Sequence, residues 1–316
     1  MNKSKEIKDH YQILTMQIVD KMRESIEYKT PWMICNFPPF NPVTGTYYKG
    51  INFISLISKG YNDPRFFTYN NLQELSKEKD QKLLIKKGEH GSAVFKAIQK
   101  GIFKKNEKDE NEEIAKFWMS VHAGTVFNAA QIEGLEPFIE KKLDNFEPQE
   151  EIEKIAEAFQ KQTGLSIEHQ DIKNPHYNYH NDTIYIPLKE NFEESKDYYN
   201  VLLNLIGQST IHNKRLNRVH KEQDEKKKSF EFLVGELSSY FLGARMNLSY
   251  QAQINEQQVA YLKLWVKDLE NDKMLIFKAA SKANQVVDYV LKVKKEYFNE
   301  IDDPIVEEKP TKKLKI

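Results

Sequence analysis

The sequence predicts an α+β protein of two domains, an N-terminal α/β domain over residues 1–138 and a mainly helical domain with a small sheet over residues 151–300. The length of 316 residues is sufficient for two separate hydrophobic cores. The composition of 40% hydrophobic and 12% aromatic residues supports such cores even though 30% of the residues are charged. The acidic, proline-containing stretch at residues 139–150 is typical of a linker between them.

The N-terminal half alternates helical patterns with turn formers. Apolar residues recur at helical spacing over residues 5–28, which predicts a helix, whereas the prolines between residues 30 and 45 exclude regular structure there. A second helix is expected to start within residues 53–58. A third is expected over residues 72–78, with Asn71 as its N-cap.

Strand signals follow these helices. Residues 82–91 predict a strand and a turn, and residues 117–127 alternate enough to be a returning strand. Between them, residues 103–114 form a densely charged insert, which we interpret as the solvated tip of a hairpin.

The C-terminal half is expected to be mostly helical. A short strand is predicted at residues 183–187, and the tail at residues 301–316 is expected to be disordered. Helical spacing of apolar residues predicts five helices, at residues 151–162, 195–212, 229–245, 256–270 and 275–293.

The formal charge is zero overall but unevenly distributed. Residues 1–100 carry 16 Lys and Arg against 10 Asp and Glu, whereas residues 101–316 carry 31 against 37. A basic first part is compatible with a polyanionic partner. The single cysteine excludes an internal disulfide framework and a multi-cysteine zinc site. No apolar run approaches a membrane span and the N-terminus is polar, so we expect a cytoplasmic protein with no membrane partner.

One predicted helix carries polar side chains on a buried face. The stretch 201–206 is apolar nearly all round, which is typical of a buried helix, and Asn204 and Gln208 lie one turn apart on the same face. Zincin metallopeptidases place their two zinc-binding histidines at this spacing, with a glutamate general base directly after the first. The corresponding residues here are Asn204, Leu205 and Gln208.

The surroundings of this helix resemble the ArdC-type antirestriction family, whose HExxH motif is followed by a further histidine and an Arg-Leu-Asn-Arg run. This chain has His212 and the run 215–218 in those places. The N-terminal half resembles the single-stranded-DNA-binding domain of the same family, and the resemblance covers about residues 10–295. The segments that carry it in the N-terminal half are 31–32, 41–45, 48–52, 61–65, 67–68, 87–89 and 126–134. The resemblance therefore implies a DNA-binding domain joined to a zincin-like domain.

The chemistry departs from the family pattern, because Asn204-Leu205-Ile206-Gly207-Gln208 replaces HExxH. Carboxamides are poor zinc donors, and leucine cannot accept a proton from water. We therefore predict no catalytic residue, no cofactor, and a domain that is no longer an enzyme. His212 and Glu236 are the residual candidates for a relocated zinc site, which leaves an active metalloprotease as the alternative hypothesis.

Single-stranded DNA is the expected partner. Such DNA is held by cations along its backbone and by aromatic faces on which bases stack, and no base-reading motif is present, so binding independent of sequence is predicted. A protein-interaction scaffold, with a partner on the peptidase-like domain, is the third hypothesis. The candidate DNA-binding residues are Trp32, Tyr47, Tyr48, Lys49, Asn52, Arg65, Phe66, Lys86 and Lys87.

Overall fold

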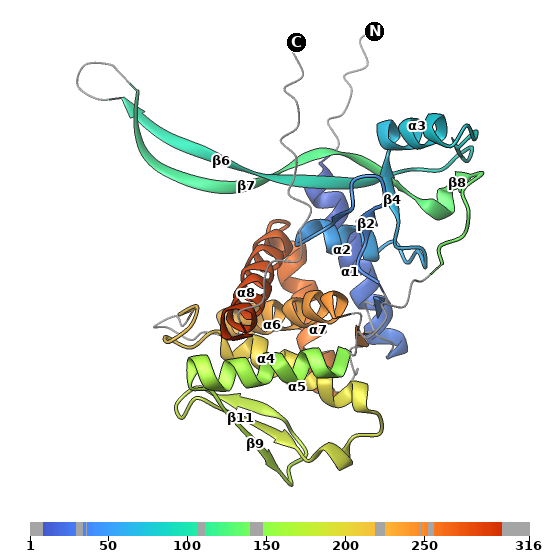
Figure 1. The fold of residues 1–316 in the computed structure, drawn as a ribbon. Coiled ribbons are helices and arrows are strands. Elements are labelled where there is room, and N and C mark those ends of the chain that lie inside the picture. Colours follow the sequence, from blue (N-terminus) through green and yellow to red (C-terminus); the bar gives the residue numbers. More distant parts are fainter. Residues whose placement is uncertain are drawn as a thin grey trace.

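The computed structural model describes residues 9–29, 34–35, 37–105, 111–139, 148–218, 225–246, 248, 250–251 and 256–298. Trp32, the tip of the charged insert at 106–110 and the C-terminal tail at 301–316 lie outside these residues. The α+β class is confirmed: helices predominate, accompanied by several small sheets (Figure 1). Among the described residues, no helix is long and apolar enough to cross a membrane.

The N-terminal half contains three helices and several short strands. The helices are α1 (His10–Tyr28), α2 (Ile51–Ile57) and α3 (Tyr69–Glu78). The short strands are β1 (Ile34–Cys35), β2 (Phe40–Asn41), β3 (Thr46–Tyr47), β4 (Phe66–Thr68), β5 (Leu84–Ile85) and β8 (Ile132–Glu133), and a 3-10 turn spans Ala129–Gln131. The predicted N-cap at Asn71 is wrong: the Thr68 side chain accepts the backbone N–H of Asn71 and so caps α3 three residues earlier.

The charged insert belongs to a long antiparallel hairpin. Strands β6 (Ser92–Lys105) and β7 (Asn111–Asn128) pair along their length, and the ribbon projects away from the helical body (Figure 1). The base of β7 also pairs with β4, so the hairpin is anchored in a three-stranded sheet. The prediction of a hairpin over this region is confirmed, although its strands extend further toward the tip than expected.

The C-terminal half is a helical body with a small sheet on one side. The helices are α4 (Pro148–Thr163), α5 (Ser195–Ser209), α6 (Glu225–Arg245), α7 (Glu256–Asn271) and α8 (Leu275–Phe298). Strands β9 (Ser166–Gln170), β10 (His176–Asn178) and β11 (Thr183–Pro187) form the sheet, a 3-10 turn spans Lys189–Asn191, and β12 (Tyr250–Gln251) follows α6. All five predicted helices and the strand at 183–187 are present.

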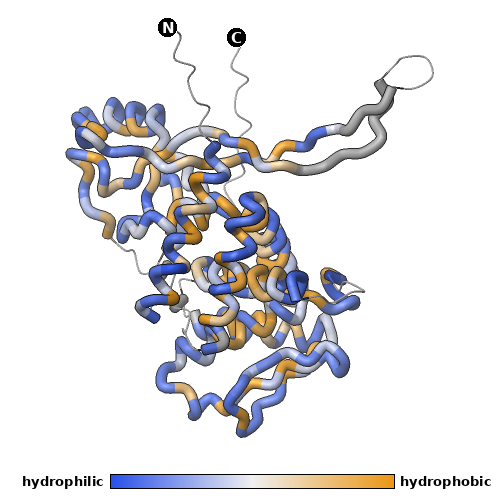
Figure 2. The backbone as a smooth tube through the Cα atoms, turned by 180° about the vertical axis from the view of Figure 1, so that it is seen from behind, coloured by the Kyte–Doolittle hydropathy of each residue, from blue (hydrophilic) through white to orange (hydrophobic). Residues whose placement is uncertain are grey.

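The main hydrophobic core spans both halves of the chain, and two smaller clusters lie within the N-terminal half. Helix α1 packs on α7, α2 packs on α8, and β1 pairs with β12. The main core cluster accordingly combines Ile18 and Ile54 with Trp265 and Ala280, all at most 2% exposed. Figure 2 shows hydrophobic segments concentrated in these central helices. Side chains from the two halves can therefore line a common surface.

Candidate functional site

The zincin-like position lies between α5 and α6. Asn204 and Gln208 project from α5 toward Glu236 on α6, whose side chain is buried. Gln208 Nε2 donates a hydrogen bond to Asn204 Oδ1, and Asn204 Nδ2 lies 3.5 Å from Glu236 Oε2. The carboxamides thus form a chain that ends on the carboxylate.

Small residues allow the two helices to approach closely at this point. A Cβ atom on Gly207 would lie 2.8 Å from Ser238 Oγ, and a Cβ on Gly235 would lie 3.2 Å from Gln208 Cγ. Leu205, at the position of the general base, is 3% exposed and belongs to the main core. No proton-accepting side chain therefore stands directly after Asn204.

His212 lies beyond the end of α5 and contacts the turn between β10 and β11. Its ring packs on Tyr179 with centroids 4.7 Å apart, and Nδ1 accepts the backbone N–H of Lys214. Burial lowers the pKa of His212, and the nearby cations Arg215 and Lys214 add to the effect, while Asp182 opposes it. Among the described residues, no group of three or more His, Cys, Asp and Glu side chains is placed to hold a metal ion.

The Arg-Leu-Asn-Arg run anchors the end of α5. The Arg215 guanidinium is fully buried, donates to the Ser209 carbonyl at 2.8 Å and forms an ion pair with Asp182, directly before β11. Arg218 bridges to Glu231 of α6 at 3.1 Å. Burial alone would raise the pKa of Asp182, but hydrogen bonds from Arg215 and Tyr177 outweigh it and hold that pKa below its usual 3.8. The run is therefore structural.

The N-terminal motif 48–52 combines structural and exposed residues. Tyr48 packs edge-on against Phe66, and burial raises the pKa of its hydroxyl to about 12. Gly50 has φ of +55° and caps α2, a backbone conformation that favours glycine. The Asn52 carboxamide donates to and accepts from the Phe95 backbone, both at 2.7 Å, and so fixes α2 to β6. The Lys49 side chain is exposed and makes no hydrogen bond or ion pair within the described residues, whereas its backbone carbonyl accepts the N–H groups of Asn52 and Phe53.

The motif 126–134 is a second structural network. Asn128 donates to the Asp63 carbonyl at 2.7 Å, and its backbone N–H is accepted by the Gln131 side chain. Gln131 in turn donates to Glu89 and to the His90 carbonyl. These bonds join β4, β7 and the turn after β5. The Asn128 and Gln131 side chains therefore hold the fold.

The predicted DNA-binding residues separate into two classes. Phe66 is 2% exposed and packs in the core, and Asn52 holds the backbone of Phe95. The prediction that these two residues contact DNA directly is therefore replaced by a role in supporting the fold. Arg65 is 15% exposed and forms a two-pronged pair with Asp63. Its charge is therefore already partnered.

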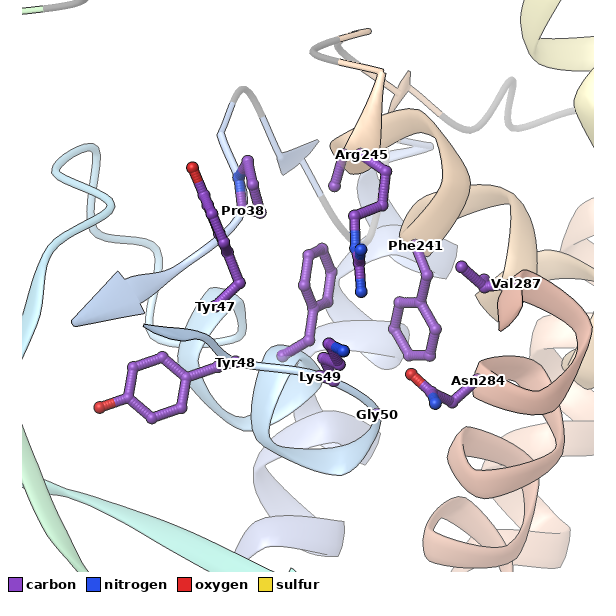
Figure 3. A pocket seen from close by; sticks show the side chains of 11 residues that line it. Pro38, Tyr47, Tyr48, Lys49, Gly50, Phe241, Arg245, Asn284 and Val287 are labelled. Carbon is purple, nitrogen blue, oxygen red and sulfur yellow. The ribbon is translucent and has the colours of Figure 1, made fainter. Parts of the chain in front are cut away.

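Four of the remaining described candidates, Tyr47, Lys49, Lys86 and Lys87, are exposed, whereas Tyr48 is half-buried. Tyr47 is 49% exposed, and Lys86 and Lys87 lie exposed on the turn after β5, where Lys86 Nζ donates to the Ala130 carbonyl. Tyr47, Tyr48 and Lys49 also line a small pocket that is open to solvent (Figure 3). Its opposite wall comes from α6 and α8 and includes Phe241, Arg245, Asn284 and Val287. The sequence alone gave no signal for these four residues.

Comparisons with known proteins agree with this arrangement. A family model for the N-terminal domain of the anti-restriction factor ArdC matches residues 8–127, and one for zincin-like metallopeptidases matches residues 154–282. The metal-free crystal structure of the antirestriction protein ArdC from plasmid R388 is 30% identical, with a TM-score of 0.67, over 92% of this chain and 99% of that one. The chain belongs to the ArdC antirestriction family. The resemblance drawn from the sequence is therefore confirmed, together with the two-domain composition.

Longer proteins contain the same region. The DNA primase TraC of Escherichia coli is 30% identical over 306 residues, and a second TraC of that species is 28% identical over 301 residues. The chain spans 27% and 20% of their lengths, respectively, although the matches cover 90% of the chain.

One prediction is overturned by these comparisons. The R388 ArdC protein has also been solved with Mn(II) bound, at 28% identity and a TM-score of 0.61 over 90% of this chain. The expectation that no metal cofactor applies is therefore wrong for this family. An ion at the zincin-like position of this chain would take oxygen ligands from Asn204, Gln208 and Glu236, and carboxylate and carbonyl oxygens suit Mn²⁺. A bound ion would polarise a carbonyl or a water molecule.

Proposed function

We propose that this protein binds single-stranded DNA independently of sequence, as an antirestriction-type protein that covers incoming DNA of a mobile element. The observation that carries the proposal is the exposed pair Tyr47 and Lys49, held on a rigid segment by Asn52 and Gly50. An aromatic face beside an unpaired cation supplies the two contacts that unstacked DNA needs. The exposed Lys86 and Lys87 extend the cationic surface on the same half of the molecule.

The peptidase-like domain is proposed to have no hydrolytic activity. Leu205 offers no base for water even when a metal ion is supplied, and general-base assistance contributes about 10²–10⁴ to such reactions. His212 is a poor replacement for the missing base, because its ring lies against Tyr179 and one of its two nitrogens, Nδ1, already accepts a backbone N–H. The domain then serves as scaffold and as a surface for another protein.

DNA binding is tested by fluorescence anisotropy with a labelled oligonucleotide, single-stranded or annealed to its complement, over a salt series. We expect tighter binding of the single strand and an affinity that falls as salt rises, because each phosphate contact releases counterions. Equal affinity for the two forms, or no dependence on salt, would refute the proposal.

Hydrolysis is tested separately with casein and a quenched peptide library in the presence of added Mn²⁺ or Zn²⁺. We expect no cleavage above a metal-only control. Metal-dependent cleavage that is lost in His212→Ala or Glu236→Gln would instead establish the relocated metalloprotease site.

A further inference from the structure

The pocket in Figure 3 joins the two halves of the chain at one surface. Its first wall is the segment from Tyr47 to Gly50 with Phe53, and its second wall is the end of α6 with the middle of α8. The rings of Phe53 and Phe241 meet across the junction, edge-on, with centroids 5.0 Å apart. The floor is therefore apolar and fixed by the shared core.

Two cations from different halves of the chain line this pocket. Lys49 belongs to the first wall and Arg245, the last residue of α6, to the second. In Figure 3 the Arg245 side chain extends into the space between the walls, toward Lys49 and Phe241. Within the described residues neither cationic side chain makes a hydrogen bond or an ion pair. Burial lowers the pKa of Arg245, whereas the charges of Asp288 and Tyr47 act in the opposite direction. The Arg245 guanidinium is therefore partly shielded from water.

The nearby polar groups leave the pocket positive. Asn284 lines it and donates a hydrogen bond of 3.0 Å to Asp288, whose side chain is exposed. Asp288 is the carboxylate that acts on Arg245, and the lining contains no Asp or Glu of its own. Two cations against one solvent-exposed carboxylate favour an anion at the junction. Tyr47, half-exposed and packed on one side against Phe40, forms the aromatic rim.

We propose that this junction pocket binds one nucleotide unit of single-stranded DNA, with its phosphate between Lys49 and Arg245 and its base stacked on Tyr47. The inference rests on the proposed function and extends it by making the peptidase-like half part of the DNA-binding surface. The cations and the aromatic rim lie at the mouth of an open, shallow junction, so the unit would rest on this surface and not inside an enclosed cavity. Arginine is suited to this place because its planar guanidinium donates two parallel bonds to a phosphate.

The test uses the full chain and an oligothymidylate longer than the roughly 4–16 nucleotides that single-strand-binding folds cover. Affinity is measured by anisotropy over a salt series for the wild type, Arg245→Gln, Lys49→Gln and the double variant. Lys282→Gln is the matched control, because Lys282 is exposed on α8 and does not line the pocket. Thermal unfolding shows whether each variant is folded. If Arg245→Gln does not fold, Lys49→Gln carries the test, because the Lys49 side chain is exposed.

We expect each pocket variant to lose about tenfold or more in affinity, as a charged hydrogen bond to phosphate implies. The slope of log affinity against log salt should fall by about 0.7 for each cation removed. Lys282→Gln should match the wild type. If the wild type binds single strands but Arg245→Gln and Lys49→Gln behave like Lys282→Gln, the pocket assignment is refuted while the proposed function stands.

A second arm distinguishes a free nucleotide from a unit of a strand. Thymidine monophosphate is titrated into the wild type and Arg245→Gln by calorimetry. Binding of the mononucleotide that depends on Arg245, together with unchanged oligonucleotide affinity in Arg245→Gln, would overturn the inference, because the pocket would then serve a free nucleotide. If the wild type binds no single-stranded DNA in either arm, the proposed function itself fails.

Discussion

Removing Arg215 should strongly destabilise the protein while leaving its binding surface intact. The guanidinium is fully buried and holds Asp182, whose side chain is 7% exposed. Arg215→Met keeps most of the volume but leaves the carboxylate without its main partner, and breaking a buried pair in this way costs roughly 3–5 kcal/mol. Lys214 and His212 lie 3.5 and 3.8 Å from Asp182 and offset part of the cost, so we expect the lower end, about 3 kcal/mol.

The pH dependence of this cost has a defined sign. In the wild type the pKa of Asp182 is lower in the folded than in the unfolded state, so its stabilisation is present above pH 3.8 and is lost as the pH falls further. In Arg215→Met, burial without the cation raises that pKa, so protonation relieves the penalty. The difference in the free energy of unfolding between the wild type and Arg215→Met is therefore largest near neutral pH and becomes smaller in acid.

Urea unfolding followed by circular dichroism at pH 7 and at about pH 4 measures both quantities. Arg23→Met is the control, because Arg23 pairs with Glu270 at the exposed surface, where ion pairs contribute at most about 1 kcal/mol. In an Asp182→Asn background, Arg215→Met should cost less than it does alone. A loss below 1 kcal/mol at pH 7, or an equal loss in the Asp182→Asn background, would refute a structural role for the motif.

Four further predictions concern single positions. Tyr47→Ala should weaken single-strand binding by about 1–3 kcal/mol with an unchanged melting temperature, whereas Tyr48→Ala should lower the melting temperature. Equal effects of the two variants on binding would contradict the assignment of Tyr47 to base stacking and of Tyr48 to packing. Gly50→Ala should cost about 1–3 kcal/mol in urea unfolding, because φ of +55° with ψ of −128° strains a side chain; an unchanged midpoint would count against this. Gly207→Ala should cost a similar ~1–3 kcal/mol by crowding Ser238, and Ser238→Gly should recover part of it; no recovery would exclude this clash as the cause. Because the pKa of His212 is lower in the folded state, stability should fall as the pH drops below 6.5, and His212→Asn should flatten that part of the unfolding profile; an unaltered profile would remove His212 as the cause.

Much of the fold could be predicted from the sequence because its signals are local. Helical spacing located α4 to α8, and alternation with a charged insert located the β6–β7 hairpin. The N-cap at Thr68 was missed because Asn71 is an equally suitable capping residue, and the choice between them depends on backbone geometry.

The candidate sites also divide into residues that local spacing reveals and residues that only tertiary packing brings together. The replacements at Asn204, Leu205 and Gln208 were visible because they occupy fixed spacings on one helix. The junction pocket was not, since it brings Lys49 beside Arg245, almost two hundred positions away in the chain, through the packing of α2 on α8. The burial of Phe66 and the pairing of Arg65 with Asp63 are likewise tertiary outcomes, which composition and spacing do not report.

The metal expectation failed for a different reason. It judged the site by its suitability for zinc, whereas the R388 ArdC protein has been solved with Mn(II), an ion that accepts oxygen ligands. Restoring histidine at positions 204 and 208 together with glutamate at 205 tests whether the loss of these side chains alone prevents zinc binding. We expect Asn204→His/Leu205→Glu/Gln208→His to gain stoichiometric zinc by elemental analysis, and a failure to do so in a folded protein would show that the surrounding helices no longer accommodate that geometry.

The most direct test of the central claim compares the wild type with the double variant Tyr47→Ala/Lys49→Gln for binding of one oligonucleotide sequence, single-stranded and duplex, at two salt concentrations. Loss of one stack and one phosphate contact predicts that the wild type prefers the single strand and that the double variant loses this preference while its melting temperature is unchanged. A folded double variant that retains the full salt-sensitive preference, or a wild type that shows none, would contradict the account.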